Sequence, residues 1–357
     1  MVQIDHVHFY VDPAQVWRNW FVHLLGFQCQ SSLRTLDHEQ DVLDNGHLKL
    51  HLSAPRSPHS PIAQFLQKHP PGVADIALRV QNLAEICAHP KVRVLIPPHQ
   101  TSGGELTAQI AAWGSLRHTL IQGQLKAQLE EPALEKGPRT PELERPVEAI
   151  DHSVLNVPRG ELQAVVEWYC QVLGFTPQQQ FTIATARSSL HSQVLVHPDS
   201  GVQLPINEPT SANSQIQEFL DHNRGAGIQH IALKTPDILH WVPQLRQLGL
   251  SFLKVPGTYY EGLRQKPGFC LKESEWRQLI EAEILVDWND ATYPALLLQT
   301  FTEPIFKEPT FFFELIERRS VQVQGQSITA QGFGEGNFQA LFEAVEQQQL
   351  QRRKPHP

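Results

Sequence analysis

The chain has 357 residues and a formal net charge of −8, with basic and acidic side chains interspersed along it. This length suits two domains of ordinary size, and the composition is typical of a globular protein in water. Because there is no long basic stripe, we do not expect a nucleic-acid partner. No apolar run approaches the ~18 residues that cross a bilayer, so a membrane partner is not expected either.

The N-terminus and the cysteines indicate the compartment. Residues 1–5 (MVQID) have neither the charged nor the apolar region of a secretory signal. Four cysteines lie far apart without a C-x-x-C pair, which is typical of free thiols in a reducing cytosol: Cys29, Cys87, Cys170 and Cys270. We therefore expect a cytoplasmic protein.

Three short segments mark the first half of the chain. Residues 4–8 (IDHVH) include the start of a predicted strand at 7–11, and an amphipathic stretch follows that ends in LLGF at 24–27. Further along come GVADIAL at 72–78 and RHTLI at 117–121. From 128 to 148 the sequence mixes charge with proline, which predicts an interdomain linker.

The second half begins with IDHSV at 150–154 and continues with regular spacing. Apolar residues from Leu162 to Leu173 recur at helical intervals, and Gly174 ends the predicted helix. Further elements are predicted as strands at 193–196, 202–206, 228–233 and 310–318 and as a helix at 238–248. A C-terminal amphipathic helix is predicted from Phe338, Leu341, Phe342 and Val345.

The two halves repeat one plan. IDHVH and LLGF match IDHSV and VLGF at 172–175, GVADIAL matches GIQHIAL at 227–233, and RHTLI matches FFELI at 312–316. This indicates an α+β fold of four βαβββ-like modules, two per domain. We expect an N-terminal domain at 1–127, the linker at 128–148 and a C-terminal domain at 149–357.

The second half alone combines His152, His230 and Glu314; the first half has Asp75 and Thr119 at the last two positions. A single histidine in a chain with 18 is more often a core or surface residue. Glu314 is different, because strand alternation places this carboxylate on an apolar face, which is costly unless it is paired or bound to metal. The alternative for Glu314 is a buried salt bridge to Arg318 or Arg319. Two histidines and one carboxylate are the ligand set of non-haem Fe(II) sites with open positions.

Eight segments, some of which include the candidate ligands, occur in one order along the chain. In these segments the chain resembles the 4-hydroxyphenylpyruvate dioxygenase family of the vicinal-oxygen-chelate superfamily. The resemblance covers nearly the whole chain and is stronger at 150–347 than at 1–148. Its segments are IDH at 150–152, LPINEP at 204–209, SQIQEFL at 214–220, GAGIQH at 225–230, TYY at 258–260, LQTF at 298–301, FELIER at 313–318 and GFGEGNF at 332–338.

The resemblance implies two half-barrel domains of the vicinal-oxygen-chelate type, a C-terminal lid helix and an Fe(II) cofactor held by His152, His230 and Glu314. It implies catalytic roles for Gln229, Gln299, Phe333 and Asn337. It implies a substrate pocket formed by Ser192, Asn207, Gln215, Phe301, Phe312 and Phe338. The alternative for the glutamines is ordinary surface polarity, above all for Gln215. The alternative for the glycine-rich stretch is a phosphate cradle, which is discounted because its spacing fits no P-loop.

The implied reaction converts 4-hydroxyphenylpyruvate and O2 to homogentisate and CO2, as in tyrosine catabolism and in homogentisate supply for quinone and tocopherol synthesis. Two rivals remain, 4-hydroxymandelate synthase on the same fold and a metal-free binding protein of the superfamily. Phe333 and the segment 205–207 favour homogentisate as the product. We expect the small-molecule substrate and O2 as ligands, and a homo-oligomer, either a dimer or a tetramer.

Overall fold

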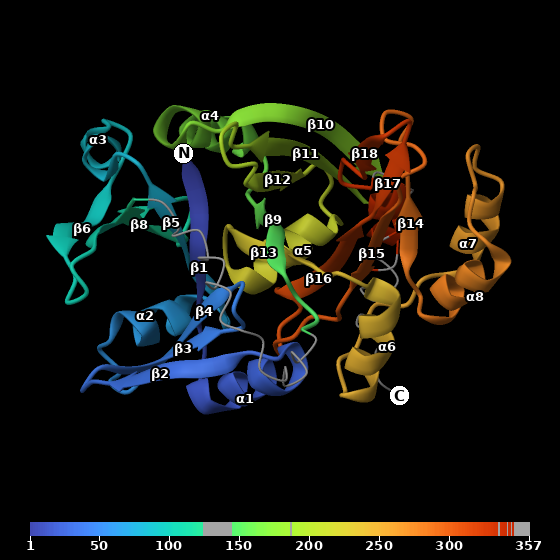
Figure 1. Ribbon diagram of the computed structural model, residues 1–357. Helices are drawn as coiled ribbons and strands as arrows, with labels where there is room; N and C mark the ends of the chain where they lie inside the picture. Colours follow the sequence, from blue (N-terminus) through green and yellow to red (C-terminus); the bar gives the residue numbers. More distant parts are fainter. Residues whose placement is uncertain (124–144, 186–187, 335, 341, 344, 346–357) are drawn as a thin grey trace, which may run out of the picture. The chain divides into compact units, whose positions relative to one another are not determined.

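The computed structural model describes residues 1–123, 145–185, 188–334, 336–340, 342, 343 and 345 (Figure 1). Most of the predicted linker at 128–148 and Leu341 of the predicted C-terminal helix lie outside the described residues. By their contacts the residues divide into two compact units, one of 1–146, 163–178 and 194–204 and one of 147–162, 179–193 and 205–357. The proposed domain boundaries stay a prediction.

The first half forms an eight-stranded sheet in the order β2-β3-β4-β1-β5-β8-β7-β6. β1 pairs in parallel with β4 and antiparallel with β5, so each βαβββ module contributes half of the sheet. Its elements are β1 (Val2–Tyr10), α1 (Ala14–Leu25), β2 (Gln28–Arg34), β3 (His38–Asp44), β4 (Lys49–Pro55), α2 (Pro61–Lys68), β5 (Gly72–Val80), α3 (Leu83–Ala88), β6 (Val94–Gln100), β7 (Leu106–Ala111) and β8 (Arg117–Gln122).

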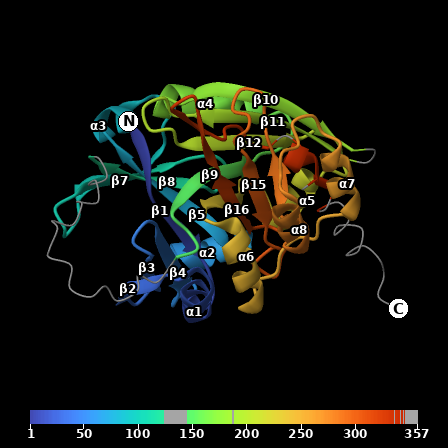
Figure 2. The same ribbon diagram turned by 45° about the vertical axis from the view of Figure 1, so that its right-hand side comes forward.

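The second half repeats this order as β10-β11-β12-β9-β13-β16-β15-β14, which confirms the predicted tandem modules. Figure 2 shows β16 and β15 of this sheet side by side, and β13 separates β16 from β9 in the strand order. The elements are β9 (Ala149–Asn156), α4 (Leu162–Leu173), β10 (Thr176–Ala184), β11 (Ser189–Val196), β12 (Gln203–Pro209), α5 (Gln215–Asn223), β13 (Gly227–Lys234), α6 (Ile238–Gln247), α7 (Gly257–Arg264), α8 (Glu273–Glu281), β14 (Leu285–Asp287), β15 (Leu297–Phe301), β16 (Phe312–Arg318), β17 (Ser320–Val323) and β18 (Gln326–Thr329).

The pairing of β13 positions the three predicted ligands. β13 runs antiparallel to β9 and parallel to β16, and Ala232 lies opposite both His152 and Glu314. His230 lies two residues from Ala232, and side chains two apart on a strand share a face. The sheet register therefore places all three candidate ligands on one face.

The last helical residues, 336–340, 342, 343 and 345, join two apolar clusters of the second unit. Phe342 is fully buried with Ile183 and Phe219, and Ala340 packs with Phe301 and Phe312. Burying one such phenylalanine contributes about 1.5–3 kcal/mol. This packing holds the predicted C-terminal helix against the sheet that carries the candidate ligands.

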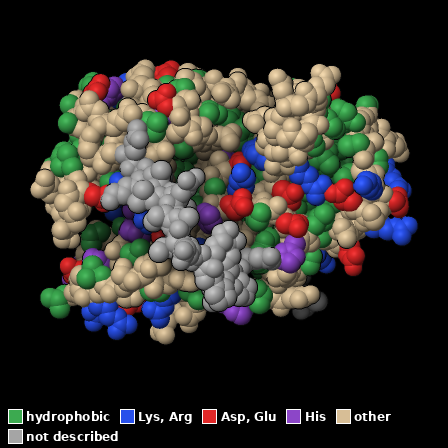
Figure 3. Space-filling model, viewed as in Figure 1, with side chains coloured by type: hydrophobic (Ala, Val, Ile, Leu, Met, Phe, Trp, Pro, Cys, Tyr) green, Lys and Arg blue, Asp and Glu red, His purple; other side chains and the backbone are tan. Residues whose placement is uncertain are grey.

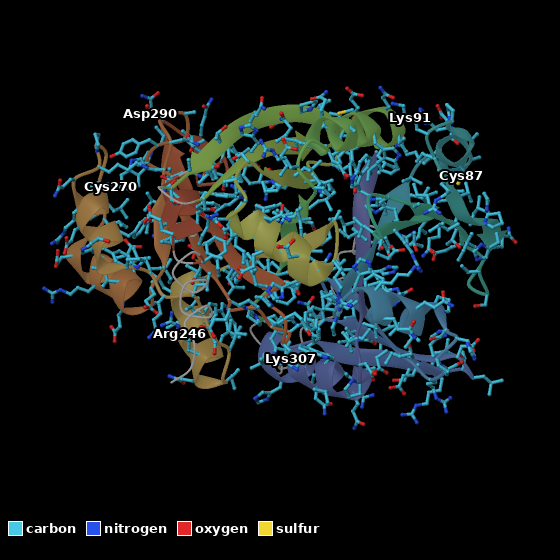
Figure 4. The ribbon with its side chains drawn as sticks, turned by 180° about the vertical axis from the view of Figure 1, so that it is seen from behind. Cys87, Lys91, Arg246, Cys270, Asp290 and Lys307 are labelled. Atoms are coloured by element: carbon cyan, nitrogen blue, oxygen red, sulfur yellow. The ribbon has the colours of Figure 1, made fainter. Side chains whose placement is uncertain are left out.

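Surface features agree with the composition. Lys and Arg side chains lie mixed with Asp and Glu on the face shown in Figure 3. All four cysteines are free, including the labelled Cys87 on α3 and Cys270 beyond α7 (Figure 4), so the prediction of free thiols is confirmed. Within the described ranges, every helix is too short or too polar to cross a membrane.

Candidate metal centre

Three ligand atoms converge on the buried face of the second sheet. Nε2 of His152 lies 3.3 Å and Nε2 of His230 lies 3.6 Å from Oε2 of Glu314, and the ligand atoms all lie within 4.8 Å of one another. All three residues are at most 3% exposed. A first-row metal ion lies about 2.0–2.2 Å from each of its ligand atoms. Two ligand atoms at right angles about the ion are therefore about 3 Å apart. The spacing therefore fits one metal ion.

The electrostatics of the group also favour a bound cation. Burial opposes protonation of His152, but the carboxylates of Glu314 and Asp151 outweigh it and raise the pKa of His152 to about 9. Burial and the neighbouring His152 hold the pKa of His230 well below its ordinary value. A buried carboxylate facing two imidazoles needs a positive charge, either a proton on His152 or a metal ion that takes its place.

The alternative partners of Glu314 are otherwise engaged. Arg318 donates to Asp151, with a Nε–Oδ2 distance of 2.7 Å, and Arg319 donates to Glu317 over 2.9 Å. Oε1 of Glu314 instead accepts a 2.8 Å hydrogen bond from Nε2 of Gln299. The hypothesis that Glu314 forms a salt bridge with Arg318 or Arg319 is therefore wrong, and its other oxygen remains directed at the two histidines.

A small cavity adjoins the three ligands. Its walls are largely aromatic, and its free volume is about 10 Å³, room for one water molecule at most. The Phe333 ring meets the His152 ring edge-on at 5.1 Å, and Phe181 meets Phe338 of the last helix at 5.6 Å. The lining residues are His152, Val154, Phe181, Pro205, His230, Gln299, Phe301, Glu314, Phe333 and Phe338.

The predicted site residues separate by the cavity that they line. Gln299, Phe301, Phe333 and Phe338 line this cavity with the three ligands. A second small cavity is lined by Gln215, Gln229 and Phe312, and the Phe312 ring stacks on the His230 ring at 4.8 Å. Ser192 and Asn207 line neither of these two cavities. Both are buried, and Oγ of Ser192 and Oδ1 of Asn207 have no hydrogen-bond partner in the described structure. Asn337 is fully buried and bonds to Gln299.

Sequence reasoning missed three wall residues, Val154, Phe181 and Pro205. Val154 lies two positions beyond His152 on β9, so strand alternation predicts that it shares the ligand face. Pro205 lies within the segment 205–207 that the sequence did single out, although no role in the cavity wall was assigned to it. Phe181 gives only a weak signal, because it alternates with the buried Ile183 at the end of β10 while the rest of that strand is polar and mostly exposed.

In the first half, the matching positions are satisfied by their own contacts. Asp75 accepts hydrogen bonds from Thr119 Oγ1 at 2.8 Å and from Gln109 Nε2 at 2.9 Å. Nδ1 of His6, which matches His152, lies 2.7 Å from Oδ1 of Asp5. Within the described residues, the only cluster with metal-ligand spacing is that of the second half.

Comparison with known proteins places this geometry in a family. The profile of the Glyoxalase/Bleomycin resistance protein/Dioxygenase superfamily matches residues 149–267. The chain is 36% identical to an uncharacterized protein of Synechocystis sp., over 99% of this chain and all of that protein. It is 34% identical to 4-hydroxyphenylpyruvate dioxygenase of Dictyostelium discoideum, over 99% of each chain.

A solved structure gives the same result for the fold. A variant of 4-hydroxymandelate synthase from Streptomyces coelicolor superposes with a TM-score of 0.82 at 25% identity, covering 97% of this chain and 98% of that one. The two-domain vicinal-oxygen-chelate fold expected from the sequence is thereby confirmed. With a curated relative at 34% identity over its whole length, the chain belongs to the 4-hydroxyphenylpyruvate dioxygenase family.

Proposed function

We propose that the protein is an Fe(II)-dependent dioxygenase that converts 4-hydroxyphenylpyruvate and O2 to homogentisate and CO2. The observation that carries the proposal is the buried group of His152, His230 and Glu314 in the wall of an aromatic cavity. Two histidines and a carboxylate hold non-haem iron and leave positions open for other ligands. Family membership supports the choice of substrate.

In the proposed reaction both oxygen atoms of O2 enter the products. One becomes the new ring hydroxyl of homogentisate, on the ring carbon that carried the side chain; the side chain moves to the neighbouring ring carbon, which loses its proton. The other oxygen atom enters the carboxylate that forms when CO2 leaves the 2-oxo acid. A bound Fe(II) would activate O2 for this chemistry, and the four electrons that reduce O2 come from the substrate, two from the decarboxylation and two from the ring hydroxylation. The 2-oxo acid is oxidised within the same molecule, so the protein needs no second organic reductant.

We assign the protein side of the reaction to orientation and to exclusion of water. Phe301, Phe333 and Phe338 would hold the substrate ring against the ligand face. Gln299 would fix the orientation of Glu314 through its 2.8 Å hydrogen bond. The free polar atoms of Ser192 and Asn207, with Gln215 and Gln229, are proposed to receive the phenol and keto-acid ends of the substrate.

The narrow cavity implies a gate. With room for one water at most, it admits a substituted phenyl ring only after an aromatic wall moves. Phe338 is part-buried and meets only Phe181 among the ring contacts of the described residues. We propose that the last helix, which carries Phe338, opens for the substrate and closes over it, which is the lid role implied by the sequence.

The second candidate is 4-hydroxymandelate synthase, because a variant of that enzyme shares the fold over nearly the whole chain. Product identity separates the two. Protein purified without oxygen is loaded with Fe(II), mixed with 4-hydroxyphenylpyruvate and O2, and its products are separated by chromatography. We expect homogentisate and one CO2 per turnover. If the main product is 4-hydroxymandelate, the assignment moves to the synthase. If iron-loaded protein forms neither product, 4-hydroxyphenylpyruvate is excluded as the substrate.

The cytoplasmic location, the tyrosine pathway and the homo-oligomer stay predictions.

A further inference from the structure

A β-bulge places a second carboxylate beside one of the three candidate ligands. On β9, His152 pairs with Ala232 and Ile150 pairs with Leu233, so Asp151 is an extra residue without a partner on β13. Consecutive strand residues normally point to opposite faces, and a bulge changes this direction locally. Oδ1 of Asp151 consequently lies 2.9 Å from Nδ1 of its own neighbour, His152.

Asp151 is itself fixed by Arg318 at the end of β16. The guanidinium donates from Nε to Oδ2 over 2.7 Å and from Nη2 to Oδ1 over 2.8 Å, which is the two-pronged geometry that arginine offers a carboxylate. Both side chains are at most 10% exposed. A third donor, Nη1, reaches the carbonyl oxygen of Gly332 at 2.8 Å, next to the Phe333 that packs on His152.

We infer that Asp151 and Arg318 are positioning residues for the metal site. Asp151 accepts the Nδ1 proton of His152, which leaves the lone pair of Nε2 directed at the position shared with His230 and Glu314. Arg318 holds the Asp151 carboxylate in this orientation and ties it to the loop before Phe333. His230 differs, since its Nδ1 is buried and has no hydrogen-bond partner in the described structure. The metal site is thus supported from the His152 side.

The first half of the chain supplies a matched control. There too a bulge leaves Asp5 as an extra residue, its Oδ1 lies 2.7 Å from Nδ1 of His6, and Arg79 donates to its Oδ2 over 2.6 Å. Arg79 comes from β5 rather than from the strand that matches β16; it donates to Asp5 from Nε, while its Nη2 lies 2.8 Å from Oε1 of Glu105. This copy has no carboxylate at the Glu314 position. Asp5→Asn therefore changes the matching carboxylate–histidine and carboxylate–arginine contacts without touching the candidate metal site.

The inference rests on the metal-binding part of the proposed function, and the test needs no substrate. Co(II) affinity is measured by competition with a chelator, and the visible absorption of bound Co(II) reports its coordination geometry. We expect Asp151→Asn to weaken Co(II) binding 10- to 100-fold and to change the absorption spectrum. Asp5→Asn should stay within twofold of the unmodified protein, although both variants lose stability.

Arg318→Lys tests the second step, since it keeps the charge and loses the two-pronged geometry. We expect it to weaken Co(II) binding in the unmodified background and to change affinity less than twofold once Asp151→Asn is present. Unchanged affinity in Asp151→Asn, or equal losses in Asp151→Asn and Asp5→Asn, would overturn the inference. Unmodified protein that binds no Co(II) would instead refute the metal site of the proposed function. If Asp151→Asn does not fold, the affinity of Arg318→Lys alone decides, and no change there overturns the inference.

Discussion

Asn337 donates a 2.7 Å hydrogen bond from Nδ2 to Oε1 of Gln299, and this bond joins the last helix to the sheet that carries the candidate metal ligands. Gln299 in turn donates to Glu314 over 2.8 Å, and the hydroxyl of Tyr259 donates to Oδ1 of Asn337 over 2.7 Å. A continuous chain of hydrogen bonds therefore runs from α7 through the last helix to a candidate metal ligand. Movement of the helix is coupled to the orientation of Glu314.

Replacing Asn337 with Ala should break this coupling. Oε1 of Gln299 loses a buried donor, which costs about 1–3 kcal/mol. The hydroxyl of Tyr259 loses Asn337 but keeps the carbonyl oxygen of Val286 at 2.9 Å. We expect kcat to fall at least tenfold while bound iron per protein stays near that of the unmodified enzyme, because no ligand is removed. Gln339→Ala, which removes an exposed bond to Glu343 on the same helix, is the control. Parallel loss of iron and turnover would contradict the assigned role.

Gly334 tests the same chain by steric means. Its φ is +67°, and a Cβ there would lie 2.2 Å from Oε1 of Gln299 and 3.2 Å from Nδ2 of Asn337. Gly334→Ala should displace the Gln299 amide and lower kcat/KM at least tenfold. Gly325→Ala is the matched control, because Gly325 has a φ of +82° with nothing within 4 Å, so it carries the backbone strain without the clash. Equal effects of the two variants on kcat/KM would assign the loss to backbone strain alone.

The metal site should be confined to the second half. His230→Ala removes a ligand at the centre of the group and should abolish both iron binding and turnover. His6→Ala changes the matching strand of the first half, where Asp75 is already satisfied by Thr119 and Gln109. Iron stoichiometry, measured by metal analysis of protein purified without oxygen, should stay unchanged in His6→Ala. Loss of iron in that variant would refute a metal-free first half.

How far the sequence could predict this site depends on strand periodicity. Comparison of the two halves singled out His152, His230 and Glu314, and the register about Ala232 explains why residues so far apart share one face. Alternation along a strand is fixed by the backbone, so a carboxylate among phenylalanines could be recognised without a structure. The cavity wall formed by Phe301, Phe333 and Phe338 followed only from the family resemblance.

Other features depend on contacts between distant segments or on irregular backbone. The bulge at Asp151 breaks the alternation on which the prediction relied, so the partner of Arg318 could not be inferred. Phe181 reaches the cavity from a mostly polar strand whose apolar alternation is limited to Phe181 and Ile183. α7 and α8 were not predicted either; α8 buries only Trp276 and Leu279, too few residues for a clear helical pattern.

The histidines of the first half predict a loss of stability in acid. Burial and the neighbouring His6 hold the pKa of His51 at about 3, below its ordinary 6.5, and burial with His51 holds the pKa of His8 well below that value. The unfolded chain takes up protons below pH 6.5 while the folded chain does not, so stability is full above 6.5 and is lost as pH falls toward 3. Each such group contributes a slope of about 1.4 kcal/mol per pH unit at most.

Urea unfolding between pH 7 and 4.5 measures how the free energy of unfolding depends on pH. This dependence should be shallower in His51→Asn, whereas His23→Asn, at an exposed histidine, should follow the unmodified protein. Identical slopes in all three proteins would contradict this prediction.

The outcome of the proposed reaction should depend on Phe333. Its ring meets the His152 ring at 5.1 Å and forms part of the cavity wall beside Gln299, so it limits where the substrate ring can lie. Attack on the ring gives homogentisate, and attack on the benzylic carbon gives 4-hydroxymandelate; the two carbons are neighbours, so a small change of the wall can decide between them. Replacing Phe333 with Ile removes the flat ring and leaves the substrate side chain free to swing. We expect homogentisate as the main product of the unmodified protein and a measurable share of 4-hydroxymandelate from Phe333→Ile, both quantified by chromatography.

Phe306→Ile, at a buried phenylalanine that is not among the cavity-lining residues, controls for loss of packing. The same product ratio in Phe333→Ile and in the unmodified protein would show that this ring does not direct the reaction.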